Sequence, residues 1–168
     1  VLFEVDDPKR QWQTLDLEKD LPKLITKARF LSGKDPDLRR FKDHGGKLLI
    51  YNGWGDAGVN PYHVIDYYNK VQKIVGEETK DFARLFLIPG MFHCLCGLNV
   101  DRFGTMTPII NWVEAGVAPD SIPAARIESG KVARTRPLCP YPEVATYDGK
   151  GSTDEARNFR CVRPKYKE

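Results

Sequence analysis

An aspartate and a histidine that could act together as an acid–base pair follow two apolar segments of this sequence. Asp56 lies in the glycine-rich segment 52–58, directly after the apolar run 47–51, and His93 follows the run 82–88. A histidine whose ring is oriented by a carboxylate can take a proton from a nucleophile as a general base. The plain alternatives are that Asp56 only forms a turn and that His93 only lies on the surface.

The segments around these two residues predict strands and a helix in alternation. Residues 47–51 are a short apolar run bounded by glycines, which is typical of a buried parallel strand. Residues 60–76 begin with asparagine and proline, end at glycine and carry apolar residues on one face, which predicts a helix. Residues 82–88 predict a second strand, ended by proline and glycine.

Strand, helix and strand in this order predict two parallel strands joined by a right-handed crossover. Functional residues of such sheets emerge at the carboxyl ends of the strands, so we expect the loops of Asp56 and His93 to be neighbours. In α/β-hydrolases the catalytic residues follow the chain order nucleophile, acid, histidine. Asp56 and His93 therefore have the order of the second and third members of such a triad.

Apolar periodicity predicts three further helices, over residues 14–31, 36–43 and about 105–115. The last fifty or so residues show little regular pattern and indicate an irregular tail. Two of the four cysteines, Cys139 and Cys161, lie in this tail, and Cys94 and Cys96 follow His93, so three complete pairings are open. A Cys139–Cys161 disulfide would compensate for weak packing by about 3 kcal/mol, the alternative being two buried free thiols.

Composition excludes several classes of protein. The chain has 168 residues, of which 41% are hydrophobic and 29% are charged, values typical of a globular protein of about one domain. The net charge is only +3 and the basic residues are scattered, so we expect no nucleic-acid partner. No apolar run reaches the roughly 20 residues that span a bilayer, so we expect no membrane partner. A single C-x-C is a weak zinc signal, and we expect no metal ligands.

Four groups of segments carry a family resemblance: residues 45–51 with 53–56, residues 82–91 with 93–94, residues 111–114 with 118–120, and residues 136–142 with Cys161. Together they resemble the tannase and feruloyl esterase family, secreted α/β-hydrolases that cleave aromatic esters. The similarity runs from about Pro36 to Pro164, and its tail motif is the most specific part.

The resemblance implies roles for individual residues. The positions of Asp56 and His93 match the family's catalytic acid and base. The family's cysteine after the histidine is bonded to a cysteine next to the nucleophilic serine, so Cys94 is expected to pair with a cysteine outside this chain. Cys139 and Cys161 match the family's tail disulfide, which leaves Cys96 free.

The nucleophile of such an enzyme is missing from this sequence. None of its four serines, Ser32, Ser121, Ser129 and Ser152, lies in a G-x-S-x-G motif. In the family the serine lies earlier in the chain, and a lid domain with a calcium site separates it from the acid and base. We therefore expect an α/β fold in which residues 1–135 are the C-terminal part of a hydrolase sheet, with parallel strands and flanking helices. Residues 136–168 would be an irregular, cysteine-bridged tail packed on it, and the nucleophile half and the lid would be absent.

These observations predict a secreted serine-type carboxylesterase for feruloyl, galloyl or related phenolic esters, inactive as the isolated chain. Its partner would be an N-terminal half or second chain that carries the serine, disulfide-linked through Cys94. No cofactor is expected in this chain, because the calcium site would lie in the lid. Trp54, Tyr62 and Phe92 could contact an aromatic substrate or could only pack the loops. The alternative function is a non-catalytic remnant or binding module that keeps the scaffold.

Overall fold

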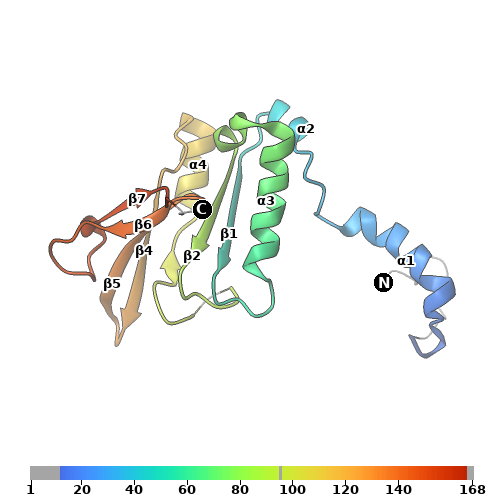
Figure 1. Ribbon diagram of the computed structural model, residues 1–168, viewed down its shortest axis with the longest axis horizontal. Helices are drawn as coiled ribbons and strands as arrows, with labels where there is room; N and C mark the ends of the chain where they lie inside the picture. The colour runs from blue at the N-terminus through green and yellow to red at the C-terminus, as the bar shows by residue number, and fades with distance from the viewer. Residues whose placement is uncertain (1–11, 95, 166–168) are drawn as a thin grey trace. The chain divides into compact units, whose positions relative to one another are not determined.

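The architecture centres on one pair of parallel strands, seen in a computed structural model that describes residues 12–94 and 96–165 (Figure 1). The chain divides into two compact units, residues 1–35 and residues 36–168. In chain order the helices and strands are α1 (Leu17–Leu31), α2 (Arg39–Asp43), β1 (Leu48–Gly53), α3 (Pro61–Val75), β2 (Ala83–Ile88), β3 (Arg102–Phe103), α4 (Met106–Ala115), β4 (Ile122–Glu128), β5 (Lys131–Leu138), β6 (Val144–Tyr147) and β7 (Phe159–Val162), with short 3-10 turns at Trp12–Thr14, Glu77–Asp81 and Ala156–Asn158.

The described part of the first unit is mainly the helix α1. It begins later than the predicted residue 14, because Asp16 caps it: the Oδ1 atom of Asp16 accepts hydrogen bonds from the amides of Glu18 and Lys19, at 3.1 and 3.2 Å. The helix is amphipathic, as its sequence predicts, and its side chains Leu17 and Ile25 are exposed.

The predicted strand–helix–strand unit is confirmed. Strands β1 and β2 pair in parallel over their full length, from Leu48 opposite Ala83 to Gly53 opposite Ile88. Helix α3 connects them and begins where the sequence indicates, because the Oδ1 atom of Asn60 accepts a 2.9 Å hydrogen bond from the amide of Tyr62. Both strands therefore end at the same edge, each followed by one of the two candidate loops.

The two faces of this strand pair bury different cores, because side chains alternate along a strand. One face packs against α3, which lies alongside β1 and β2 in Figure 1, and buries Tyr68, Val71 and Leu85. The other face buries Phe86 and Ile88 against residues that follow β2 in the chain, namely Met91, Val100, Ile122, Ala124 and Leu138. Trp112 of α4 is 1% exposed and lies beneath Lys47 and Arg84 at the start of the strands.

The expectation that the last fifty residues lack regular structure is wrong. Strands β3, β4 and β5 form an antiparallel sheet and β6 pairs with β7 as an antiparallel hairpin, so the fold is not a purely parallel one. The pattern is missed because β5 carries mostly polar residues and because Pro123 pairs with Pro137 inside the β4–β5 ladder. The turn between β4 and β5 is a Ser129–Gly130 pair with φ of 50° and 75°, a hairpin signal that the sequence did offer.

The tail is crosslinked within itself by a disulfide and is joined to the core by backbone contacts. Cys139 and Cys161 form the disulfide, which is the pairing expected from the sequence. Residue Pro140 forms an antiparallel bridge to Phe86, and the amide of Tyr141 donates a 2.7 Å hydrogen bond to the carbonyl of Leu85. This short segment continues the sheet beyond β2, on the side away from β1.

Candidate active site

The loop after β1 holds Asp56 by backbone hydrogen bonds. The Oδ1 atom of Asp56 accepts the amide hydrogens of Gly58 and Val59, each at 2.8 Å, and the side chain is only 6% exposed. The hydrogen bond from Val59, followed by the interactions with His93 and Gly58, lowers the pKa of the Asp56 carboxyl, although its partial burial opposes this. The loop therefore presents a fixed carboxylate that is ionised at neutral pH.

The loop after β2 carries His93 in a tight turn, called here the His93 turn and defined as residues 90–94 and 96–98. The amide of Phe92 donates to the carbonyl of Cys96 at 2.9 Å, and the amide of Leu98 donates to the carbonyl of Gly90 at 2.8 Å. Cys94 has φ of 64°, an uncommon conformation for a residue with a side chain, so the chain reverses sharply beside His93. The turn projects an imidazole that is 59% exposed.

Backbone contacts join the two loops at the edge of the sheet. The amide of Trp54 donates to the carbonyl of Ile88 at 3.0 Å, and the amide of Gly55 donates to the carbonyl of Met91 at 2.9 Å. Gly53 allows this approach, because a Cβ atom built on it would lie 2.3 Å from the Met91 carbonyl oxygen. The neighbouring strand ends thus bring the two loops into direct contact.

The structure brings the two predicted residues together. The Nδ1 atom of His93 lies 3.0 Å from both Asp56 carboxylate oxygens. An ionised carboxylate only accepts hydrogen bonds, so the proton between the two groups is carried by Nδ1. Nε2 is then the ring nitrogen that can accept a proton from another group. This arrangement can orient an imidazole and stabilise its cation when it takes up a second proton.

Sequence and fold comparisons agree on the family. The family model described as "Tannase and feruloyl esterase" matches residues 7–162. The chain belongs to the tannase and feruloyl esterase family. The resemblance inferred from the sequence is therefore confirmed.

Several members of the family are similar to parts of this chain. It is 45% identical over 131 residues to a mono(2-hydroxyethyl) terephthalate hydrolase of Piscinibacter sakaiensis, a match that covers 76% of this chain and 22% of that protein. It is 34% identical over 155 residues to a probable feruloyl esterase of Arthroderma benhamiae, covering 86% of this chain and 29% of that one. The crystal structure of feruloyl esterase B from Aspergillus oryzae aligns with a TM-score of 0.76 at 26% identity, covering 95% of this chain and 36% of its own. The chain thus spans 22% to 36% of the length of these three relatives.

Aromatic side chains lie around the acid–base pair of this family member. Trp54 and Tyr62 pack edge to face with ring centroids 5.7 Å apart, and they are 41% and 68% exposed. Phe92 is 44% exposed and packs against Gly55, whose Cβ position would lie 2.8 Å from the Phe92 ring. Trp54 and Phe92 therefore both pack within the loops and present ring surface to solvent.

A cavity of about 630 Å³ begins at Trp54 and Tyr62 and was not predicted from the sequence. Leu87 of β2 also lines it, together with tail residues between Arg136 and Ala145. Neither Phe92 nor His93 is part of its lining. No local sequence pattern indicates this cavity, because part of its lining comes from the tail docked beside β2.

Two free thiols and a second histidine lie outside the acid–base pair. Cys94 and Cys96 are exposed thiols, both in the left-handed backbone region. His44 lies at the end of α2, with Nδ1 at 2.7 Å from the Arg40 carbonyl oxygen, away from the acid–base pair in sequence and fold. Among residues 12–94 and 96–165, no group of three histidine, cysteine, aspartate or glutamate side chains is placed to hold a metal ion. No described helix is both long and apolar enough to cross a membrane.

Proposed function

We propose that this chain supplies the acid and the base of a serine carboxylesterase that cleaves aromatic esters. The observation that carries the proposal is the contact between His93 and Asp56, with the imidazole exposed and its Nδ1 atom 3.0 Å from both carboxylate oxygens. The order of these residues along the chain is that of an α/β-hydrolase triad. Membership of the tannase and feruloyl esterase family supports the same reading.

The roles of the two residues follow from their positions. Nε2 of His93 accepts the proton of the serine hydroxyl as the serine attacks the ester carbonyl, and it then returns that proton to the leaving alcohol. Asp56 keeps the other ring proton on Nδ1 and stabilises the imidazolium between the two transfers. A water molecule then repeats the sequence and hydrolyses the acyl-enzyme. Asp56 is suited to this role because its carboxyl pKa is lowered by the amide of Val59 and by His93.

The nucleophile in this proposal comes from outside the 168 residues. None of the four serines lies in a G-x-S-x-G motif. A serine-bearing segment or second chain would complete the site, linked by a disulfide to Cys94, whose thiol is exposed and adjacent to His93. A disulfide-linked assembly of this kind belongs in an oxidising environment, so we place the protein outside the cell. The isolated chain is expected to lack esterase activity.

The proposed substrates are small esters of phenolic or related aromatic acids. Relatives of this chain are described as a feruloyl esterase and as a terephthalate hydrolase, and both names refer to aromatic acids. Trp54, Tyr62 and Phe92 expose ring surface near the acid–base pair and offer stacking contacts to such a ring. No step of this mechanism depends on a metal or cofactor held by the described residues.

Hydrolysis assays on two polypeptides test the proposal. One is the 168-residue chain, and the other is the longest polypeptide encoded in one frame with it. Methyl ferulate, methyl gallate and p-nitrophenyl acetate serve as substrates. We expect turnover only by the longer polypeptide, and we expect His93→Ala and Asp56→Asn to lower kcat by at least 1000-fold, on the order of the losses known for triad residues.

His44→Ala is the matched control, because it removes an imidazole on α2 that contacts only a carbonyl oxygen in the described contacts. It should leave kcat unchanged. Turnover by the isolated chain that disappears in His93→Ala would overturn the need for an external serine. Full activity of His93→Ala in the longer polypeptide would overturn the assignment of the base.

The disulfide through Cys94 has its own test. The mass of the native protein is measured before and after reduction, followed by peptide mapping. A peptide containing Cys94 joined to a peptide from another segment supports the link. A native Cys94 that reacts with iodoacetamide without prior reduction would contradict it.

A further inference from the structure

An arginine holds the second limb of the His93 turn, which we define as residues 97–99; the first limb is residues 90–92. The Nη1 atom of Arg126, on β4, donates hydrogen bonds to the carbonyl oxygens of Gly97 and Asn99, at 2.7 and 3.2 Å. Both carbonyls lie just after His93 in the chain. One guanidinium nitrogen therefore bridges two points of the limb that returns from the turn to the core.

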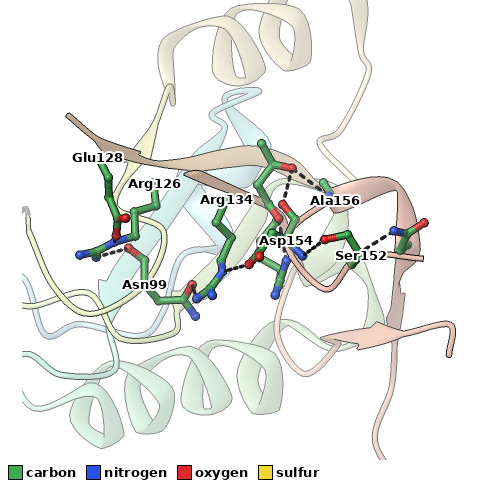
Figure 2. A network of polar contacts seen from close by, with 10 residues as sticks. Asn99, Arg126, Glu128, Arg134, Ser152, Asp154 and Ala156 are labelled. Atoms are coloured by element: carbon green, nitrogen blue, oxygen red, sulfur yellow. Dashed lines mark hydrogen bonds and ion pairs between the residues drawn. The ribbon is translucent and has the colours of Figure 1, made fainter. Parts of the chain in front are cut away.

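Arg126 is itself fixed from its other side. Its Nε atom donates to the Glu128 carboxylate at 2.6 Å, and its side chain is 28% exposed. Figure 2 shows Arg126 between Glu128 and Asn99, with its guanidinium directed toward the limb. The planar group is oriented by contacts on two sides, which a flexible ammonium group would not achieve.

A second arginine connects the same limb to the tail. The Nη1 atom of Arg134, on β5, donates to the side-chain oxygen of Asn99 at 3.4 Å, and its Nε atom donates to Asp154 at 2.6 Å. The Asp154 carbonyl in turn accepts a 2.8 Å hydrogen bond from the amide of Thr135. We call Asn99, Arg126, Glu128, Arg134 and Asp154 the arginine network.

The charges of this network indicate support rather than ligand binding. Each guanidinium has its own carboxylate, Glu128 for Arg126 and Asp154 for Arg134. The recess of about 270 Å³ between them is therefore charge-balanced and offers no excess positive charge to an anion. The Nη1 atom of each guanidinium is directed at the limb that follows His93.

The second limb of the His93 turn is held by backbone and polar contacts. His93 is 59% exposed and Leu98 is 78% exposed, so neither side chain is held by a core. The first limb is anchored by Met91, which is 1% exposed and whose carbonyl accepts the amide hydrogen of Gly55. The second limb pairs with the first through the Leu98–Gly90 hydrogen bond and the Met91–Gly97 bridge. The arginine network fixes this paired turn to β4 and β5.

We propose that Arg126 is a positioning residue for His93, and that Arg134 with Asp154 extends this support to the tail. The catalytic meaning of this role depends on the proposed esterase function, but the positioning itself does not. Loss of the Arg126 contacts should let the second limb move. His93 would then meet Asp56 in a range of geometries instead of one.

The test uses NMR on the folded 168-residue chain and on its Arg126→Met variant. The exchange rates of the Phe92 and Leu98 amides report the two hydrogen bonds across the turn. We expect both rates to rise about tenfold in Arg126→Met, because a hydrogen bond from a charged donor favours the closed turn over the open one by about a factor of ten. The ¹⁵N shifts of His93 report its tautomer, and the pure Nδ1–H signal of the parent should become a mixture.

Matched variants separate positioning from general destabilisation. Arg157→Met removes an equally charged but 77% exposed partner of Glu155 and should change neither readout. Arg126→Lys keeps the charge without the planar fork and should raise the two exchange rates at least threefold, so it replaces Arg126→Met should the latter fail to fold. Arg134→Met should raise the exchange rate of the Leu98 amide by less than Arg126→Met does.

Two results would overturn the proposal. One is a folded Arg126 variant whose Phe92 and Leu98 amides exchange within twofold of the parent and whose His93 tautomer is unchanged. The other is an equal rise at every amide, including those of β1 and β2, which would show only global loss of stability. Neither readout requires turnover, so a failed esterase assay with a positive NMR result would overturn the proposed function alone.

Discussion

Replacing Gly53 by alanine is expected to push the loops of Asp56 and His93 apart. A Cβ atom at this position would lie 2.3 Å from the Met91 carbonyl oxygen and 2.8 Å from both the Met91 carbonyl carbon and the Phe92 oxygen. These are backbone atoms, so no side-chain rotation can relieve the contact. The loop must move by about 1.1 Å to restore a contact of ordinary length.

The cost of that movement follows from the packing around it. Met91 is 1% exposed and belongs to the buried core beside Ile88 and Val100, so the loop cannot shift into empty space. Overpacking of this kind costs about 1–3 kcal/mol, which lowers Tm by roughly 5–10 °C for a unit of this size. A displacement of the His93 imidazole by about 1 Å should also lower kcat/KM of the proposed complete enzyme by roughly 100-fold.

Thermal unfolding followed by circular dichroism measures the first effect, and ester hydrolysis by the longer polypeptide measures the second. Gly104→Ala is the control, because a Cβ atom there would meet nothing within 4 Å. It should leave Tm and kcat/KM unchanged. A Gly53→Ala variant with the Tm of the parent and an unchanged ¹⁵N signature of His93 would refute the argument from close approach.

Three further predictions concern the scaffold. Burial raises the pKa of Tyr68 to about 12, and its hydroxyl donates to the Ala83 carbonyl at 3.0 Å. The neutral form is favoured in the folded state, so the resulting stability is present below pH 10 and lost between pH 10 and 12, by about 1.4 kcal/mol per pH unit relative to Tyr68→Phe in urea unfolding. Replacing both Cys139 and Cys161 by serine should remove about 3 kcal/mol of stability, and dithiothreitol should destabilise the parent by the same amount without affecting the variant. Asn60→Ala should cost about 1 kcal/mol by removing the cap of α3, and Asn60→Asp should restore it; equal stability of all three proteins would contradict the capping role.

The elements that position the candidate site were predictable because their signals are local. A glycine-bounded apolar run marks β1, an apolar run ended by proline and glycine marks β2, and Asn60 with Pro61 marks the start of α3. A crossover of this kind places both strand ends at one edge, which is enough to bring Asp56 near His93. The contact between them therefore follows from short-range patterns and one topological rule.

The rest of the site depends on contacts between distant residues. Arg126 reaches carbonyls 27 and 29 residues earlier in the chain, and nothing in its local sequence distinguishes it from other exposed arginines. The cavity beside Trp54 requires the tail to pair with β2. The β4–β5 hairpin was missed because its charged and proline-containing strands lack the alternation of a half-buried strand.

The backbone character of the contacts between the two loops has a consequence for how such enzymes diversify. Asp56 is fixed by main-chain amides, and the loops are joined through the amides of Trp54 and Gly55. The side chains of Trp54, Val59 and Phe92 take no part in these hydrogen bonds and are more than two-fifths exposed. Substitutions there can alter the surface offered to a ligand without disturbing proton transfer, so selectivity and chemistry are free to evolve as separate traits.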